Sequence, residues 1–304
     1  MSERDELIKK IQELFNQGKI SESIMKRLID EVNKRLKEEK IEKRFKKIFL
    51  ESISEDIKII GRDDINGVVF DYGKEGFNIE EKEDALYIRS KIKSLSININ
   101  ILGFLTKEES LGESLKIFVP TDVDLFVSTI SGDINIENIS GSLKVKSVSG
   151  DIEVKNIDGE IDLYSISGDI DVEEIKGNFK LNTKSGDINA KKINKSGFIK
   201  SYSGDIEIKE GDLEKGYFST FSGDISLLNI SLKESIEIKT ISGDINLITP
   251  TKDIDIIIDT KTGEGEIVYE GEKTKITKGE IGFGLKDKIL NIKTLSGNYK
   301  IEVV

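Results

Sequence analysis

Apolar and polar residues alternate along most of the chain, in short stretches separated by glycines. Between residues 132 and 185 the glycines divide the chain into six units of nine residues: GDINIENIS, GSLKVKSVS, GDIEVKNID, GEIDLYSIS, GDIDVEEIK and GNFKLNTKS. The third and fifth residues of each unit are apolar, and a third apolar residue usually follows, as at Ile134, Ile136 and Ile139. This alternation predicts one β-strand and one turn per unit.

A longer repeat combines the units in pairs. The sequence SGDI begins at residues 131, 149, 167, 185 and 203, every eighteen residues, and SGD continues more loosely at 222 and 242. A flat antiparallel meander would leave its apolar face uncovered, whereas a coil of two strands that stacks on identical coils closes its own core. The sequence therefore predicts a mostly β fold, a two-sheet β-solenoid with a coil of 18–20 residues, preceded by a short α-helical hairpin.

The SGD triplets are expected to form the corners of the coils. A tight corner calls for positive φ and for room beside the backbone of the next coil, and glycine provides both. The flanking Ser and Asp side chains can accept hydrogen bonds from local N–H groups. The predicted structural turns are Gly132, Gly150, Gly168, Gly186, Gly204, Gly223 and Gly243.

Stacked corners would also place carboxylates in a row, about 4.8 Å apart. Such a row could attract Ca²⁺, and its members would be Asp133, Asp151, Asp169, Asp187 and Asp205. The Asp recurs only once per two units and the paired glycines of calcium-binding rolls are missing, so a corner without metal is the favoured interpretation.

The first 36 residues have the pattern of two amphipathic helices. Apolar residues recur at helical spacing in residues 3–15, Asn16-Gln17-Gly18 supplies a stop, and Ser21 can cap a second helix that runs through Ile24, Leu28, Val32 and Leu36. Residues 7–36 resemble SHOCT-like helical hairpins through the turn Gly18-Lys19-Ile20-Ser21. That resemblance implies oligomerisation or docking.

A further apolar stripe with basic flanks follows in residues 40–49. We expect a basic amphipathic helix that packs on the body or on a partner, with contact to an anionic membrane as the alternative. The residues predicted for oligomerisation or membrane contact are Leu7, Ile11, Leu14, Leu28, Val32, Ile41, Lys43, Arg44, Phe45, Lys46, Lys47 and Ile48. The expected division is a helical module in residues 1–50 and a solenoid in residues 51–304.

The beginning of the body is less regular than the SGD repeats. Strands are expected at 57–60, 68–70, 85–89, 94–100, 115–119 and 125–129, with a loop at 102–114, so residues 51–130 would supply irregular first coils and a cap. Residues 115–154 resemble the putative-adhesin domain of unknown function, whose pattern here is Val119-Pro120, a polar pair, a strand and Ser131-Gly132-Asp133. The resemblance extends over residues 51–304 and implies a β-solenoid without established catalytic residues. Together with a SHOCT-like hairpin it implies a link to cell-envelope stress.

Composition argues against most kinds of catalysis. The chain has no cysteine, histidine or tryptophan, which excludes thiolate nucleophiles, histidine bases and the usual zinc sites. The repeats contain no arginine after Arg89, and no acidic residue departs from the repeat pattern, although a carboxylate-based glycosidase stays conceivable. We therefore expect no enzyme, no cofactor and no metal.

Charge and hydropathy bear on partners and location. Residues 1–50 carry a net charge of +4 and residues 51–304 a net charge of −15, so a nucleic-acid partner is not expected. No stretch has the apolar length of a membrane span, and MSERDELIKKIQELF is too charged for a signal peptide. The expected location is cytoplasmic, with a peripheral position at the membrane as a variant.

Two non-catalytic functions remain. The first is a scaffold whose rods are joined or docked by the helical head, as a homo-oligomer at the inner face of the cell envelope. The alternative is an adhesin-like module that binds a protein, a peptide or a glycan through aromatic residues or through the bulged edge of the irregular repeats after residue 186. The aromatic candidates are Tyr164, Tyr202, Tyr217, Phe218 and Phe221. The final strand, ending at Val304, could also associate end to end with another copy.

Overall fold

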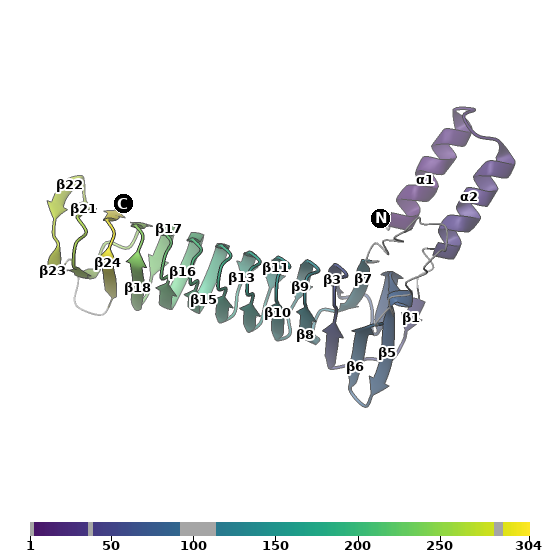
Figure 1. The fold of residues 1–304 in the computed structure, drawn as a ribbon, viewed down its shortest axis with the longest axis horizontal. Helices are drawn as coiled ribbons and strands as arrows, with labels where there is room; N and C mark the ends of the chain where they lie inside the picture. Colours follow the sequence, from purple (N-terminus) through teal and green to yellow (C-terminus); the bar gives the residue numbers. More distant parts are fainter. Residues whose placement is uncertain (1–2, 36–38, 92–113, 283–287) are drawn as a thin grey trace, which may run out of the picture.

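The chain forms a rod of stacked β-strands with a helical hairpin at one end (Figure 1). The structure is a computed structural model and describes residues 3–35, 39–91, 114–282 and 288–304. The hairpin consists of α1 (Glu3–Asn16) and α2 (Glu22–Arg35). Within the described residues no helix is both long and apolar enough to span a membrane. The predicted class, a mostly β solenoid behind a helical hairpin, is confirmed.

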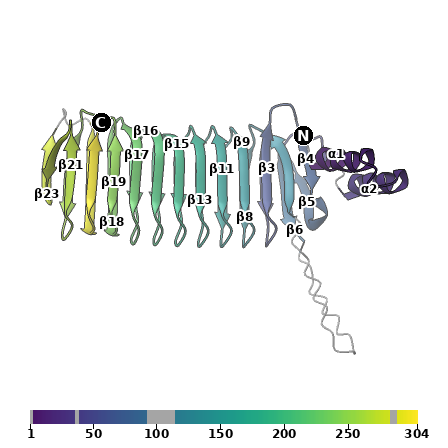
Figure 2. The same cartoon turned by 90° about the horizontal axis from the view of Figure 1, so that it is seen from above.

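The strands of the rod stand in two columns, and each coil contributes one strand to each column (Figure 2). In spatial order the first column contains β6 (Ala85–Ser90), β2 (Lys47–Glu51), β8 (Asp124–Thr129), β10 (Leu143–Ser147), β12 (Ile161–Tyr164), β14 (Phe179–Asn182), the ends of β15 (Ile188–Lys200) and β16 (Ile206–Ser219), β18 (Ser235–Ser242), β24 (Ile289–Ser296) and β20 (Asp255–Thr260).

The second column has the same parallel stacking. It contains β7 (Leu115–Pro120), β3 (Ile57–Arg62), β9 (Ile134–Ile139), β11 (Ile152–Ile157), β13 (Ile170–Ile175), the beginnings of β15 and β16, β17 (Ile225–Leu232), β19 (Ile245–Thr249), β25 (Tyr299–Val303) and β21 (Gly265–Tyr269). Because β15 and β16 run through both columns, the two columns form one continuous sheet.

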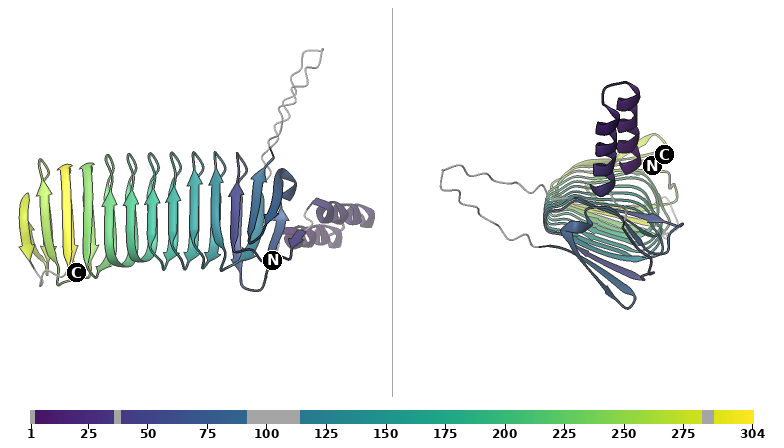
Figure 3. Two further views of the ribbon diagram at one scale, coloured as in Figure 1. Left: turned by 90° about the horizontal axis from the view of Figure 1, so that it is seen from below. Right: turned by 90° about the vertical axis from the view of Figure 1, so that its right-hand side faces the viewer.

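The register places each residue of the regular coils beside the residue eighteen positions later. Ile134 pairs with Ile152, which pairs with Ile170, and the same apolar positions are buried in every coil. Viewed along the rod the coils lie over one another (Figure 3). Equivalent residues of successive coils therefore stack on one another, and the core is a continuous row of mainly Ile, Val and Leu side chains between the two columns of strands.

A left-handed residue explains the third apolar position of each second-column strand. Asn138, Asn156 and Glu174 have φ of 61°, 54° and 60°, and Lys192, Glu210 and Asn229 repeat the conformation. This residue interrupts the strict alternation, so that the next side chain, such as Ile139 or Ile157, turns into the core and is buried. The conformation costs roughly 1 kcal/mol for a residue other than glycine, and burial of the following isoleucine offsets it.

The corner glycines are required for space and not for their φ angle. None of the SGD glycines has a positive φ, so that part of the prediction was wrong. A Cβ on Gly168 would lie 2.2 Å from the carbonyl oxygen of Gly150, and the other corners are equally tight. Beneath several corners a buried hydroxyl satisfies the backbone: the Gly168 N–H donates to Ser165 Oγ at 2.8 Å, and the same bond occurs at Gly132, Gly186 and Gly204. The predicted room for the next coil is therefore confirmed.

Both ends of the rod are built from internal parts of the sequence. The C-terminal strands β24 and β25 lie between β18/β19 and the end coil β20/β21 (Figure 2). At the other end β2 and β3 lie between the end coil β6/β7 and the coil β8/β9. End-to-end growth through the final strand is therefore wrong, because that strand is already paired on both edges.

Short antiparallel strands cover the two end coils. At one end β5 (Phe77–Lys82) pairs with β6, while β4 (Val68–Tyr72), joined to β5 by the 3₁₀ turn η1 (Lys74–Gly76), pairs with β7 and with β1 (Glu39–Ile41). At the other end β23 (Lys278–Gly282) pairs with β20, and β22 (Glu272–Lys275) pairs with β21. Such strands, which are partly charged, protect a parallel sheet against further pairing.

The predicted basic helix in residues 40–49 does not exist. The segment contains β1 and β2, and Phe45 and Ile48 are buried in the core. Ile48 and Leu50 point inward, while Phe49 points outward and stacks between Tyr87 and Phe126 of the neighbouring strands. The apolar cluster that suggested a helical stripe therefore belongs to the two faces of one strand. Membrane contact through Ile41, Phe45 and Ile48 is not available in this arrangement. The expected strand at 94–100, most of the loop at 102–114 and the expected helical residue Leu36 lie outside the described residues.

We expect Gly168→Ala to lower the free energy of unfolding by about 1–3 kcal/mol, because the added methyl group overlaps the Gly150 carbonyl and neighbouring coils must separate. Urea denaturation followed by circular dichroism measures this change. Gly76→Ala is the control, since a Cβ there meets no atom within 4 Å. Equal stability changes for the two variants would contradict the steric role of the corner.

In the coil formed by β2 and β3, Glu55 occupies the corner position that glycine has in the SGD coils, and its side chain is buried. Burial raises the pKa of this carboxyl, but hydrogen bonds from the Ser90 and Ser52 hydroxyls and from backbone N–H groups outweigh burial and lower the pKa to about 2. The stabilisation from the ionised form is complete above pH 4.5, the ordinary pKa, and is lost as the pH falls toward 2.

We therefore expect Glu55→Gln to be less stable than the wild type at pH 7 by up to about 3 kcal/mol. The difference should shrink steadily between pH 4.5 and pH 2, which denaturation curves at several pH values can measure. A difference that stays constant over this range would show that ionised Glu55 does not stabilise the first coil.

Candidate functional site

Acidic side chains form a ladder along the SGD corners. Oδ1 of Asp133 accepts the backbone N–H of Asp151 at 2.9 Å, and Oδ1 of Asp151 accepts the N–H of Asp169 at 2.8 Å. The same bond links successive members of the series Asp56, Asp133, Asp151, Asp169, Asp187, Asp205, Asp224 and Asp244. Each carboxylate thus satisfies a backbone N–H at the corner of the next coil.

The ladder is explained by these hydrogen bonds without a metal ion. Asn298 occupies the next rung, where its N–H donates to Asp244 Oδ1 at 2.7 Å and its own Oδ1 accepts the N–H of Glu264 at 3.2 Å. An uncharged amide therefore fills the same position. Within the described part of the chain no three acidic side chains are grouped in a way that could hold a metal ion.

The outer face of the first column carries the exposed aromatic residues. Lys200 and Tyr202 point outward on either side of buried Ser201, and the same alternation recurs in neighbouring coils. The term basic-aromatic face is used below for the outward side chains of this column between β12 and β20. It includes Tyr164, Lys180, Lys184, Lys200, Tyr202, Phe221, Lys239, Lys293 and Lys261.

Aromatic rings on this face stack between coils. The rings of Tyr202 and Phe221 lie 4.8 Å apart and nearly parallel, and the two side chains are 54% and 43% exposed. Phe198 and Tyr217 stack in the same way at 5.1 Å. Stacking fixes the orientation of these rings, so the face offers rigid apolar area despite its contact with solvent.

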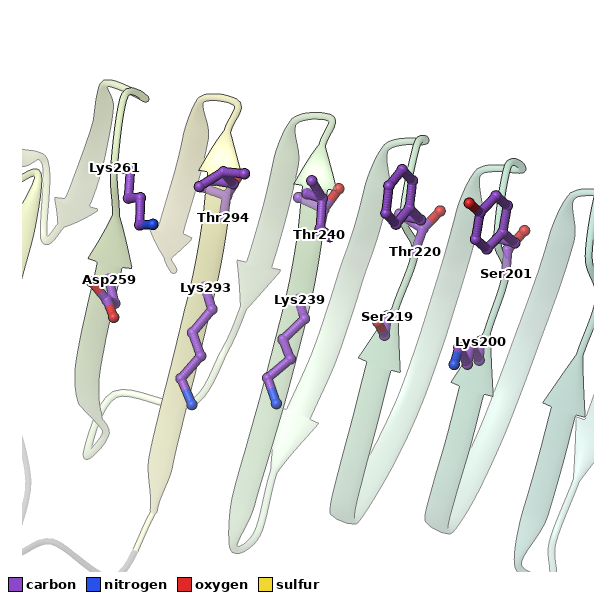
Figure 4. Close-up of a pocket in the computed structure, with 14 residues that line it drawn as sticks. Lys200, Ser201, Ser219, Thr220, Lys239, Thr240, Asp259, Lys261, Lys293 and Thr294 are labelled. Atoms are coloured by element: carbon purple, nitrogen blue, oxygen red, sulfur yellow. The ribbon is translucent and has the colours of Figure 1, made fainter.

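A shallow groove of about 420 Å³ crosses the face near β18, β24 and β20 (Figure 4). Lys239 and Lys293 extend side by side along this face, and both bind Glu237, with Nζ to Oε1 distances of 2.9 and 2.8 Å. Hydrogen bonds from these lysines, Lys239 first, lower the pKa of Glu237. One carboxylate is therefore shared by two cations, and the groove keeps an excess of positive charge.

The outer face of the second column has a different character. Lys155 and Lys191 lie 2.8 and 3.7 Å from the two carboxylate oxygens of Glu173 on the coil between them. The hydrogen bond to Glu173 raises the pKa of Lys155, and the same bond lowers the pKa of Glu173. Here lysines are neutralised by carboxylates on adjacent coils, unlike several lysines of the basic-aromatic face.

A family model described as Toastrack DUF4097 matches residues 45–302, which is most of the chain. The chain belongs to the Toastrack DUF4097 family. This membership agrees with the resemblance of residues 115–154 to an adhesin-like domain of unknown function. The matched range begins after the helical hairpin, so the family concerns the solenoid alone.

A comparison with solved structures found matches at low sequence identity and low TM-score. A protein described as a putative adhesin from Bacteroides fragilis is 14% identical, with a TM-score of 0.36, over 88% of this chain and 96% of that one. A protein described as a putative lipid-binding protein from Parabacteroides distasonis is 18% identical, with a TM-score of 0.41, over 87% of this chain and 96% of that one. A search of curated proteins gave no match.

The sequence located most of the aromatic residues of the face but not its lysines. Tyr164, Tyr202, Tyr217 and Phe221 all lie on the first column, whereas Phe218 is buried in the core, as the sequence allowed. The predicted bulged edge exists as a register shift between Lys195 and Gly197. The lysines occupy the same outward positions as the tyrosines, so the alternation within each strand could have identified them.

For the ladder, we expect Asp187→Asn to leave stability within about 0.5 kcal/mol of the wild type, because the amide oxygen can accept the Asp205 N–H as Asn298 does for Glu264. Asp187→Ala should lower it by about 1–2 kcal/mol, since that N–H loses its acceptor. Urea denaturation of the two variants checks this. A loss as large for Asn as for Ala would indicate that the charge of Asp187 is needed.

Proposed function

We propose that this protein is a non-catalytic scaffold in which the helical hairpin joins copies of the chain and each rod presents its long face to a partner. Membership of a family of unknown function with adhesin-like relatives agrees with a non-catalytic role. The single observation that carries the assembly is the exposed apolar surface of the hairpin.

The hairpin does not bury its own apolar residues. Among the hairpin side chains whose burial is described, Ile11 alone is buried, whereas Leu14 and Ile24 are 38% and 43% exposed, and Leu7, Leu28 and Val32 are half-buried. Figure 3 shows the hairpin standing away from the rod, so the strands do not cover this surface. Two helices of 14 residues are marginal without further packing. Two hairpins packed as a four-helix bundle would cover the exposed residues.

A second candidate function is binding by the basic-aromatic face, which the exposed stack of Tyr202 on Phe221 favours. The two functions are compatible, because copies joined by the hairpin would carry several such faces. A partner that engages two faces at once binds more tightly than one that engages a single face.

We expect the double variant Leu14→Glu, Ile24→Glu to be a monomer, whereas the wild type is a dimer or higher oligomer. The two glutamates place charge in the apolar surface that the second hairpin would cover, and both positions are exposed enough for the hairpin itself to persist. Sedimentation velocity over a range of concentrations gives the assembly state.

The matched control is Asn16→Asp with Ser23→Asp, which adds the same charge at exposed positions away from the apolar stripe. The control should assemble like the wild type. A wild-type protein that stays monomeric at high concentration, or an oligomer that survives the glutamates, would show that the hairpin does not assemble the rods.

A further inference from the structure

The basic-aromatic face contains a second, larger groove, of about 800 Å³, over β12, β14 and β15. Tyr164 and Tyr202 both line it, from strands two coils apart, which corresponds to about 9.6 Å along the rod at the strand spacing. Tyr202 also lies two residues further along its strand, because Tyr164 is in register with Lys200. Phe221 covers one face of the Tyr202 ring from the following coil, and the other face is turned toward the groove and toward Lys184 on the preceding coil. Asn182 lies between Tyr164 and Lys200, on the middle strand.

Three lysines surround the groove. Among the described residues, Lys180, Lys184 and Lys200 form no ion pair, and they come from two adjacent coils. Asp162, the acidic residue in register with Lys180, binds Lys144 instead, at 3.2 Å. Lys155 and Lys191, on the second column of the same coils, both bind Glu173. In a chain with a net charge of −11, this group of unneutralised lysines is complementary to a negatively charged ligand.

We propose that this groove binds a linear acidic polysaccharide, with one sugar ring beside the free face of Tyr202 and the carboxylates of neighbouring sugars at Lys180, Lys184 and Lys200. The aromatic ring contacts the apolar C–H face of the sugar. The Asn182 amide and the hydroxyls of Ser185 and Ser203, which also line the groove, can donate to and accept from sugar hydroxyls.

The position of the groove favours a polysaccharide over an acidic peptide. An extended peptide is held most firmly when its backbone pairs with a free strand edge. The strands β12, β14 and β15 are paired on both sides, so only side chains are presented to the ligand. A polysaccharide has no backbone amides to satisfy, and its hydroxyls and carboxylates match the side chains of the groove.

The inference rests on the proposed binding role of the basic-aromatic face and names its ligand class. The test measures fluorescence anisotropy of a labelled oligosaccharide of galacturonic acid with the full-length chain. We expect saturable binding that weakens as salt is added, because the ion pairs are exposed to solvent. The triple variant Lys180→Gln, Lys184→Gln, Lys200→Gln should bind about tenfold more weakly.

The matched control is Lys155→Gln, Lys191→Gln, Lys209→Gln, which removes the same charge from the second column and should change the affinity less than about twofold. Tyr202→Leu should weaken binding at constant charge, since it keeps apolar bulk and removes the ring face. Circular dichroism should show all variants folded, because the altered side chains are solvent-accessible.

Absence of binding, or an equal loss in both triple variants, would overturn the inference. So would poly-glutamate or vesicles with anionic lipid that bind as tightly as the oligosaccharide and respond to the same variants. The assembly variant Leu14→Glu, Ile24→Glu separates the two proposals. If this variant is a monomer and still binds the oligosaccharide, the groove proposal stands independently of assembly. If the wild type is an oligomer but does not bind the oligosaccharide, only the groove proposal is overturned.

Discussion

The close contact between successive corners is the constraint on which the rest of the structure depends. Each SGD corner places a glycine directly over the carbonyl of the preceding corner, where no Cβ fits. The contact fixes the stacking distance at the corner, so the strands, the hydroxyls beneath the corners and the aspartates beside them must all repeat in register. The buried isoleucines supply the driving force, but an apolar core alone is non-directional and would not choose one register.

The same constraint leaves the outward positions free. Stacking restricts most inward positions to Ile, Val or Leu. The outward positions point away from the core in every coil, but their residue types differ from coil to coil. The outward positions of the second column form ion pairs between coils, such as that of Lys155 with Glu173. Among the described residues, the outward positions of the first column include stacked aromatic rings and lysines without an ion pair. A regular core can therefore carry two unlike faces, and the groove for which we propose binding lies where the outward pattern departs from charge neutralisation.

The regular coils could be predicted from the sequence because their periodicity is local and repeated. The ends could not. That β24 and β25 insert between two earlier coils is a choice among parallel pairings that offer the same apolar surface, and residues 289–303 keep the apolar alternation of an ordinary repeat. The prediction for residues 40–49 was wrong for another reason. Phe45, which is buried before β2 begins, and Phe49, which stacks on the outer face of β2, stand with inward Ile48 at a spacing that imitates one face of a helix. Of the candidate site, the aromatic residues were found, but the absence of acidic partners at Lys184 and Lys200 appears only when the coils are stacked.

The insertion of both chain ends has a consequence for the rod as a scaffold. In an ordinary solenoid the terminal coil has one neighbour and frays first. Here the coils formed by β2/β3 and by β24/β25 each have two neighbours, and the outermost coils are continuous with the chain on both sides. Fraying of an end coil thus requires the antiparallel covering strands to open, among them β4, which pairs with β1 directly after the hairpin. It leaves β2, the first strand of the two columns along the chain, paired with β8. The order of the strands along the chain and their order along the rod therefore differ in a way that keeps the first and the last column strands paired when an end coil opens.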